Sequence, residues 1–421
     1  MFRTYRIWFL LALVLALVPP GVRLLMWQRT VSLPVDPVMA RAGEDLFKHE
    51  WTPNDPLSPN GDGLGPVFNA ASCVACHNQG GPGGSGDLKH NVTTFTVRIP
   101  GQQRQGVVHA HATGRPETLQ DVHSSLPAIS QPSLDQLVTV SSTSNHCMSF
   151  PRGVHLSQRN TPALFGVKLI DEIPERDIVA GAKAQQLKWG LAPTEAEDVP
   201  VGRVFHLPDG RVGRFGWKAQ IASLSDFVQL ACANELGLGN PGHEQPKPIY
   251  KEASSYRAPG LDLTAEQCDQ LTAFCASLPR PVERLTSDVK EETAVAGKKL
   301  FGTIGCADCH TPKLGRVDGI YSDLLLHQMG LELVGGGSYG EPPIPDSPGG
   351  DGPSPSEWRT PPLWGVADSA PYLHDGRAAT LEDAIRLHAG QGERAARKFA
   401  ELSINERAQL VGFLKTLRAP Q

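Results

Sequence analysis

Hydrophobic residues recur with helical spacing in two segments that lie far apart along the chain, residues 263–278 and residues 402–417. In each segment leucine and phenylalanine fall three or four residues apart, so they would form one apolar stripe on a helix. Near its start each segment has a hydroxyl residue followed three residues later by Gln or Glu, which predicts a capping box, and a proline closely follows its end. The stripe residues are Leu271, Phe274 and Leu278 in the first segment, and Leu410, Phe413 and Leu417 in the second. The pattern predicts two amphipathic helices of the same design.

These helices close two stretches of chain that carry the same features in the same order. A short helix is predicted at residues 40–47 and again at 294–301, and the two match at Ala, Ala, Gly, Leu and Phe. The further matching pairs are 159–167 with 359–366, and 217–226 with 374–383. An internal repeat of this kind indicates duplicated structural units. We therefore predict two domains, residues 38–282 and residues 286–421.

The first domain is the longer one because residues 79–157 have no counterpart in the second. This stretch begins with a glycine-rich run and continues into alternating polar and apolar residues, such as 93–99, which predict strands. Pro208-Asp209-Gly210 lies between two short apolar runs and predicts a hairpin turn. The predicted fold class is therefore mainly α, with a loop- and strand-rich insertion in the first domain.

Each predicted domain carries one Cys-x-x-Cys-His motif, which is the attachment signal for c-type haem. Two thiols three residues apart fall on one side of a helical turn and can form thioethers with both haem vinyl groups, and the histidine is then brought beneath the iron as an axial ligand. The motif residues are Cys73, Cys76 and His77 in the first domain, and Cys306, Cys309 and His310 in the second. A zinc site or a Cys-x-x-Cys redox pair is the alternative. We predict two covalent c-type haems in two tandem cytochrome c-type domains.

The N-terminus has the pattern of an export signal. Arg3 and Arg6 precede an apolar run at residues 7–18, which is broken by Pro19-Pro20-Gly21. Because no clear cleavage site follows, residues 1–30 are either a cleaved signal peptide or an uncleaved membrane anchor. In both cases the body of the chain is exported, and we predict a periplasmic protein that is free or anchored to the inner membrane.

The composition excludes some partners and leaves four cysteines to explain. A net charge of −5 argues against nucleic-acid binding. The 43 Gly and 36 Pro favour long ordered loops around cofactors. Cysteines outside the two motifs could form disulfides in an exported protein. Cys268 and Cys275 would lie roughly 10 Å apart on one helix, too far to bridge each other. A bond between Cys147 and Cys232 stays open.

The second axial position of a haem iron decides between electron transfer and chemistry at the iron. Glu235 and His388 occupy comparable places in the two repeats, eleven residues after Leu224 and seven residues after Leu381. Histidine at the second haem would give bis-histidine iron, which suits electron storage. Glutamate above an open iron can move a proton between the two oxygens of a bound peroxide. The alternatives are an exposed helix end for His388 and a helix-end charge for Glu235.

Three further residues are candidates for roles around the haems. In the sequence, Trp217 lies between the motifs assigned to the two haems. It is predicted to carry electrons by hopping, since indole is readily oxidised; ordinary core packing is the alternative. Arg159 and Arg359 occupy matching positions in the repeat. They could pair with haem propionates, although ordinary salt bridges would have the same sequence pattern.

Several motifs are typical of one known group of proteins. Besides the two haem signals they are residues 214–220 (Arg-Phe-Gly-Trp-Lys-Ala-Gln), 233–237 (Ala-Asn-Glu-Leu-Gly) and 371–377 (Pro-Tyr-Leu-His-Asp-Gly-Arg). With them the chain resembles the bacterial di-haem cytochrome c peroxidase superfamily, which includes the MauG-type enzymes. More narrowly, it is similar to the di-haem oxidoreductases described as thiol oxidoreductase-like. The resemblance runs from about residue 40 to the C-terminus.

The resemblance implies roles for individual residues. In that superfamily the N-terminal haem reacts with peroxide and a tryptophan lies between the haems; by motif, Trp217 matches this tryptophan and Glu235 matches the distal acid. His388 stands where the superfamily has Met or Tyr, which implies a second haem of lower potential than in Met-ligated peroxidases. Phe227 stands where those peroxidases carry a distal Gln. Some relatives hold a calcium ion between the domains, so Ca²⁺ is a further candidate cofactor.

The expected function is that of an exported di-haem c-type oxidoreductase, a peroxidase-like enzyme. Peroxide or oxygen would react at the first haem, with electrons relayed from the second. The expected partners are a small redox protein, either a cytochrome c or a cupredoxin, or an oxidisable protein substrate. The alternative is a non-catalytic di-haem electron-transfer cytochrome, which would need a second axial ligand at the first haem.

Overall fold

The computed structural model describes residues 34–99, 102–113, 154–193, 197–247, 256–285, 287–336, 339 and 352–420. The chain divides into two compact units, Met1–Val35 and Asp36–Gln421, and the described helices and strands belong to the second unit. The signal or anchor predicted at residues 1–30, and Cys147, lie outside the described residues. Within the described ranges, no helix has both the length and the apolar character needed to cross a membrane.

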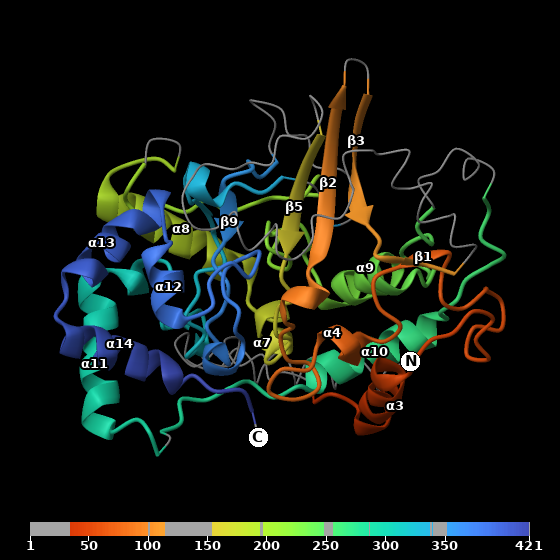
Figure 1. The fold of residues 1–421 in the computed structure, drawn as a ribbon, viewed down its shortest axis with the longest axis horizontal. Coiled ribbons are helices and arrows are strands. Elements are labelled where there is room, and N and C mark those ends of the chain that lie inside the picture. Colours follow the sequence, from red (N-terminus) through yellow and green to blue (C-terminus); the bar gives the residue numbers. More distant parts are fainter. Residues whose placement is uncertain are drawn as a thin grey trace, which may run out of the picture. The chain divides into compact units, whose positions relative to one another are not determined.

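This unit contains both helices and strands (Figure 1). The predicted mainly α class is confirmed in part, because strands also occur outside the predicted insertion at residues 79–157. The helices are α3 (Pro37–Lys48), α4 (Cys73–Cys76), α7 (Val167–Asp171), α8 (Glu175–Trp189), α9 (Leu224–Leu236), α10 (Ala265–Ser277), α11 (Glu291–Ile304), α12 (Leu381–Arg386), α13 (Glu393–Glu401) and α14 (Ile404–Lys415). The strands are β1 (Val67–Phe68), β2 (Val92–Ile99), β3 (Gln102–Val108), β4 (His111–Ala112), β5 (Val154–Arg159), β6 (Lys313–Leu314), β7 (Val317–Asp318), β8 (Leu326–Gln328) and β9 (Glu357–Arg359).

The longest strands form an antiparallel sheet in the order β3-β2-β5. Strand β2 confirms the strand predicted at residues 93–99. Thr94 of β2 is buried, and its Oγ1 donates a hydrogen bond to the Gly336 carbonyl at 3.1 Å. The sheet is therefore tied to the C-terminal half of the chain. The predicted turn is also present: Gly210 has a φ of 86°, and a single antiparallel bridge joins His206 to Val212.

Two helix pairs, α3 with α10 and α11 with α14, cross at a glycine in the same way (Figure 1). A Cβ atom on Gly43 would lie 1.9 Å from the Gln270 carbonyl oxygen, and one on Gly297 would lie 2.0 Å from the Gln409 carbonyl oxygen. Only glycine allows backbones to approach this closely. The phenylalanines that pack beside the two crossings are Phe47 with Phe274, and Phe301 with Phe413. The opening and closing helices of each repeat therefore pack against each other.

Replacing Gly297 by alanine is expected to destabilise the protein, because the new Cβ would collide with a backbone oxygen of α14. Overpacking of this kind costs about 1–3 kcal/mol or more. Urea unfolding followed by circular dichroism measures the loss. Gly302→Ala in the same helix is the matched control, since nothing lies within 4 Å of its added Cβ. That substitution should leave stability unchanged or raise it by up to about 1 kcal/mol, and equal effects of the two would contradict the crossing.

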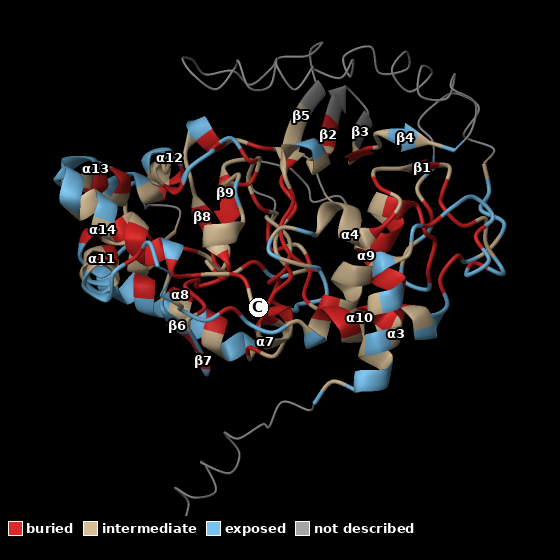
Figure 2. Cartoon of the chain, turned by 60° about the horizontal axis from the view of Figure 1, so that its bottom comes forward, coloured by how far each residue is buried: buried red, intermediate tan, exposed pale blue. Residues whose placement is uncertain are grey.

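Buried side chains form one large core that includes α3, α9 and α10, and a smaller one that includes α11 and α14. Figure 2 shows buried and exposed residues sharing the same helices, as amphipathic helices require. The predicted stripe residues that are buried are Leu271, Phe274, Leu410, Phe413 and Leu417. Both predicted capping boxes are confirmed, Thr264 with Gln267 at α10 and Ser403 with Glu406 at α14.

Candidate functional site

The first Cys-x-x-Cys-His motif folds as the single-turn helix α4, with His77 directly after it. The turn begins where Ser72 Oγ accepts a hydrogen bond from the Ala75 N–H at 3.3 Å. His77 Nδ1 lies 3.1 Å from the Gly84 carbonyl oxygen. Because a carbonyl only accepts, Nδ1 carries the proton and the lone pair is on Nε2. The Phe47 ring of α3 lies 6.2 Å from the imidazole ring.

The second motif repeats this arrangement after α11, with Cys306–Asp308 forming a 3₁₀ turn. His310 Nδ1 donates to the Tyr321 carbonyl at 3.0 Å, and the Phe301 ring lies 6.5 Å from the imidazole. Burial lowers the pKa of His310 to about 4, as it does for His77. Both imidazoles are therefore neutral at physiological pH, and each can bind a metal through Nε2.

Burial raises the pKa of the motif thiols of Cys73 and Cys306 to about 12. Because a bound zinc ion displaces thiol protons, the geometry of the ligands decides whether a zinc site is present. In the described part of the chain, one group of three side chains brings metal-ligand atoms together, namely Cys309, Asp323 and His327. There the Asp323 carboxylate already bonds His327 Nε2 at 2.8 Å. This group lacks a fourth ligand for a tetrahedral zinc site.

His388 lies opposite His310 at the second site. The centroids of their rings are 6.4 Å apart, and the ring planes make an angle of 63°. A metal bound to one nitrogen of each ring at about 2 Å would place the ring centres roughly 6 Å apart. The observed separation therefore fits one metal ion between the two imidazoles. His388 Nδ1 donates to the Ala384 carbonyl at 2.7 Å, which leaves the lone pair on Nε2.

A cavity of about 530 Å³ surrounds these two histidines. Its wall includes the indoles of Trp189 and Trp364, whose Nε1–H groups are buried and have no hydrogen-bond partner in the described segments. Further wall residues are Cys306, Cys309, Leu381 and Leu414. Facing imidazoles, two nearby thiols, an apolar wall and free N–H donors fit a haem with its iron, vinyl groups and carboxylates.

Glu235, in the last turn of α9, faces the first motif. Asn69 Nδ2 donates to Glu235 Oε2 at 2.7 Å, and Asn69 is itself fixed by the Ala110 N–H, which donates to its Oδ1 at 2.9 Å. Glu235 Oε1 is buried and makes no hydrogen bond of normal geometry to a described residue. Burial and, as a smaller cause, the Glu235 charge raise the pKa of the Cys76 thiol to about 12. The carboxyl is therefore within electrostatic reach of a predicted haem-attachment sulfur.

Tyr339 approaches the same carboxyl from the C-terminal half of the chain, and no sequence pattern singled it out. Burial raises the pKa of Glu235 to about 7, although Asn69 and Tyr339 lower it by hydrogen bonding. Tyr339 lies edge-on to Phe227 with centroids 6.4 Å apart, and Phe227 stacks on Phe215 at 5.9 Å. Where the resemblance implied a distal Gln, the structure thus has an apolar wall.

Besides Trp189 and Trp364, two further tryptophans line the cavity of the second site. Trp217, which the sequence singled out, is half-buried, and its Nε1 donates to the Asn160 carbonyl at 2.9 Å. Trp358, which the sequence reasoning missed, is buried and stacks on His374 with centroids 3.7 Å apart and planes 15° apart. The sequence feature that could have pointed to Trp358 is its position directly before the repeated motif that begins at Arg359.

Arg159 and Arg359 are both buried, and their pairing with haem propionates stays a prediction. Arg159 Nη2 donates to the Gly336 carbonyl at 2.9 Å, and Arg359 Nε donates to the Gly216 carbonyl at 2.7 Å. Backbone carbonyls thus anchor both guanidinium groups. The physical reason is the loop-rich fold, which buries carbonyls that lack partners in a helix or sheet.

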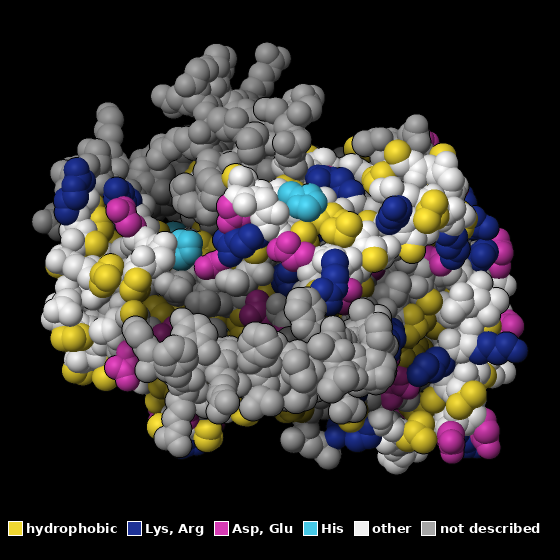
Figure 3. Space-filling view, turned by 180° about the vertical axis from the view of Figure 1, so that it is seen from behind, with side chains coloured by type: hydrophobic (Ala, Val, Ile, Leu, Met, Phe, Trp, Pro, Cys, Tyr) yellow, Lys and Arg dark blue, Asp and Glu magenta, His cyan; other side chains and the backbone are white. Residues whose placement is uncertain are grey.

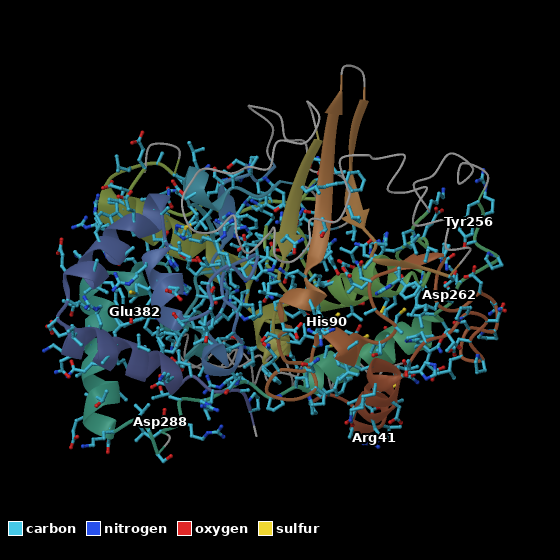
Figure 4. The ribbon with its side chains drawn as sticks, in the orientation of Figure 1. Arg41, His90, Tyr256, Asp262, Asp288 and Glu382 are labelled. Carbon is cyan, nitrogen blue, oxygen red and sulfur yellow. The ribbon has the colours of Figure 1, made fainter. Side chains whose placement is uncertain are left out.

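Other candidate groups are structural. Asp262 lies near Tyr256 before α10 (Figure 4), and its two carboxylate oxygens accept from the Gly63 N–H at 2.9 Å and the Gly239 N–H at 2.7 Å. Burial raises the pKa of Asp262 to about 6. The hydroxyl of Tyr256 donates to Asp62 at 3.1 Å. This cluster ties loops together.

The cysteines outside the motifs are reduced and buried where they are described. These residues are Cys232, Cys268 and Cys275. Burial raises the pKa of Cys268 to about 11, so its thiol is unreactive at neutral pH.

The chain matches known proteins in both sequence and structure. Residues 128–417 match the family described as "Di-haem oxidoreductase, putative peroxidase". Methylamine utilization protein MauG of Methylorubrum extorquens is 30% identical over 135 residues, which cover 30% of this chain and 35% of that protein. The match therefore spans about a third of the curated relative's own length.

Similar solved structures include the diheme peroxidase BthA from Burkholderia thailandensis, with 15% identity, a TM-score of 0.40, and coverage of 92% of this chain and 87% of that chain. A MauG-like protein associated with microbial copper homeostasis has 19% identity, a TM-score of 0.30, and coverage of 59% and 90%. Hydrazine synthase of Kuenenia stuttgartiensis has 19% identity, a TM-score of 0.35, and coverage of 62% and 73%. Because the family match covers more than half of the sequence and agrees with the resemblance carried by the motifs, the chain belongs to the di-haem oxidoreductase family, whose cofactor is haem.

Proposed function

We propose that this protein is an exported, peroxidase-like di-haem oxidoreductase, in which peroxide or oxygen reacts at the first site and electrons are relayed from the second. When bound, the two haems supply the iron centres that exchange electrons. The residues that would hold them are Cys73, Cys76 and His77 at the first site, and Cys306, Cys309, His310 and His388 at the second. The family match supports the oxidoreductase class, and the matching local geometry of the two motifs supports covalent attachment at both.

The domain plan belongs to the same proposal. Two cytochrome c-type domains would span residues 38–282 and 286–421, with residues 79–157 inserted in the first. The twin helix crossings at Gly43 and Gly297 support a duplicated unit, because the same close approach recurs with the same neighbours.

The proposed location is the periplasm, where c-type haem attachment takes place in bacteria. Residues 1–30 would direct export and would be removed or kept as a membrane anchor. A calcium ion between the domains, as in some relatives, is part of the same proposal.

Glu235 is the proposed catalytic acid–base of the first site. Its buried Oε1 can accept the proton of one peroxide oxygen and return it to the other, while Asn69 holds Oε2 in place. A pKa of about 7 lets one carboxyl perform both tasks near neutral pH. Reduction of one peroxide to two waters consumes two electrons and two protons.

Trp217 is the proposed relay for those electrons. It lines the cavity of the second site, and its N–H bonds the Asn160 carbonyl. The electrons would come from a small cytochrome c or cupredoxin, or from an oxidisable protein substrate. On the face shown in Figure 3, basic and acidic side chains are interspersed, which favours a partner without a strong net charge.

The observation that carries the proposal is the difference between the two sites. The ring of His388 lies 6.4 Å from that of His310, whereas Glu235, which holds the comparable place in the sequence repeat, acts electrostatically on Cys76 at the first site. Low-temperature EPR of the oxidised holoprotein is therefore expected to show one high-spin and one low-spin ferric signal, because one iron keeps an open position. The holoprotein should also consume peroxide.

A variant in which Cys73 and Cys76 are both replaced by alanine is the matched control, and it should lose the high-spin signal alone. Two low-spin signals in the wild-type protein, without peroxide consumption, would instead favour a non-catalytic di-haem electron-transfer cytochrome.

A further inference from the structure

A buried histidine joins the two segments that carry the proposed axial ligands of the second haem. His327, the middle residue of β8, is 1% exposed. Its Nδ1 lies 2.8 Å from Gln391 Oε1 and 3.7 Å from Cys309 Sγ. Cys309 directly precedes His310, and Gln391 lies three positions after His388. One imidazole therefore contacts a side chain close in sequence to each proposed axial ligand.

Both ring nitrogens of His327 donate hydrogen bonds. Nε2 lies 2.8 Å from the Asp323 carboxylate, which only accepts. The amide of Gln391 is oriented by its Nε2, which donates to the Val201 carbonyl at 3.3 Å, so its Oε1 faces the imidazole and accepts from Nδ1. A thioether at Cys309 would have no proton to give, so it too could only accept. The imidazole is therefore doubly protonated, and the Asp323 carboxylate balances its charge.

The Asp323 carboxylate is itself fixed by further hydrogen bonds. Its Oδ1 accepts from the Leu325 N–H at 2.9 Å, and its Oδ2 accepts from Gln185 Nε2 at 2.8 Å. Gln185, on α8, also donates to the Asp308 carbonyl at 2.9 Å, inside the second Cys-x-x-Cys-His motif. The pair of His327 with Asp323 is therefore held against the segment that carries the proximal ligand.

The segment that follows His388 packs against the same strand. A Cβ atom on Gly390 would lie 2.5 Å from the Gln328 carbonyl oxygen, so the two backbones are in contact. Gln391 is 3% exposed, and it adds the hydrogen bond to His327. Both His327 and Gln391 line the cavity of the second site. A buried polar contact thus ties the segment of the distal ligand to β8.

We propose that Asp323, His327 and Gln391, here called the His327 cluster, hold His388 at the distance from His310 that lets both bind one iron. His327 is then a positioning residue that acts through Gln391. This inference rests on the proposed function, in which His388 is the second axial ligand of the second haem. Because the three side chains are buried, removal of one leaves the others without a partner that water could readily replace.

The test uses cyanide as a competitor for the second iron. Cyanide can bind there only after His388 has left, so its apparent affinity measures how firmly His388 is held. The oxidised, haem-loaded, full-length protein is titrated with cyanide, and the loss of the bis-histidine low-spin EPR signal is followed. In Gln391→Leu the cyanide concentration that removes half of this signal should fall by about tenfold or more, since a buried hydrogen bond from a charged donor is lost. Gln391→Glu keeps an oxygen that accepts from His327 and should keep the wild-type value.

His327→Leu removes the donor and should lower the cyanide midpoint in the same way, so the test does not depend on one variant folding. Gln328→Ala, at the next position of β8, is the matched control. The Gln328 side chain bonds Ser354 and Ser356, so its removal loses hydrogen bonds outside the His327 cluster. A general loosening of this region would lower the midpoint in the control as well, whereas loss of positioning would leave the control unchanged.

Equal cyanide midpoints in the wild type, Gln391→Leu and His327→Leu would overturn the proposal, and so would an equal decrease in Gln328→Ala. A wild-type protein without a bis-histidine signal would overturn both the assignment of His388 and this proposal. The readout does not use peroxide. If the holoprotein does not consume peroxide and both cluster variants still show the decrease, the peroxidase function fails and the positioning role stands. Peroxide consumption with unchanged midpoints would give the opposite conclusion.

Discussion

Glu235→Gln is expected to slow the reaction of the holoprotein with peroxide by about 10²- to 10⁴-fold, the usual range for loss of a positioned acid–base group. The glutamine keeps the shape of the site and can still accept from Asn69, but it cannot take a proton from peroxide. Stopped-flow mixing with peroxide measures the rate. Glu401→Gln, on the exposed end of α13, is the matched control and should leave the rate unchanged.

The same substitution has a pH signature. In the wild-type protein the rate should rise as the pH increases through about 7, because the carboxylate is the form that accepts the proton. The variant should show no such rise. Stability should change in the opposite sense. Folding raises the pKa of the wild-type carboxyl from 4.5 to about 7, so the protein loses free energy of unfolding as the pH rises between these values. The glutamine variant has no such group and should lose none of it over this range. A full rate in the variant, with an unchanged pH profile, would remove Glu235 from the mechanism.

His388→Ala is expected to abolish the low-spin ferric signal while leaving the high-spin signal in place. The imidazole that faces His310 at 6.4 Å would be gone, and the second iron would keep one axial ligand. EPR of the oxidised variant measures this directly. Electron delivery to the first site should fall as well, since the axial ligand sets the potential of the iron.

Added imidazole should restore the low-spin signal, because a small ligand can enter the space left by the side chain. His206→Ala, at an exposed position, should leave both signals unchanged. A low-spin signal that survives unchanged in His388→Ala would assign the second axial position to another residue.

The sequence predicted those features that depend on neighbours along the chain. The stripes and capping boxes of α10 and α14 follow from residues three or four apart, and the structure confirms them. The strand at 93–99 follows from alternation and is confirmed as β2. The family was recognised from short motifs and is confirmed by the match over residues 128–417. The axial role of His388, the acid–base role of Glu235 and the relay through Trp217 stay predictions.

The features that the sequence did not reveal depend on contacts between distant segments. Tyr339 lies in a Gly- and Pro-rich stretch without periodicity, so nothing local ties it to Glu235. The stack of Trp358 on His374 joins β9 to a residue further along the chain. The carbonyls that accept from Arg159 and Arg359 depend on which backbone groups the fold leaves unpaired.

Because Tyr339 lies close to Glu235, the surroundings of Glu235 become complete only late in the synthesis of the chain. The two residues are more than a hundred positions apart, and Arg159 and Lys218 hold carbonyls on either side of the segment that carries Tyr339. A nascent chain that ended at residue 282 would already carry the first Cys-x-x-Cys-His motif and Glu235, but its carboxyl would lack this cover. The surroundings of Glu235 are thus completed only after Tyr339 has been made, so on the proposed function a truncated chain would lack a finished first site.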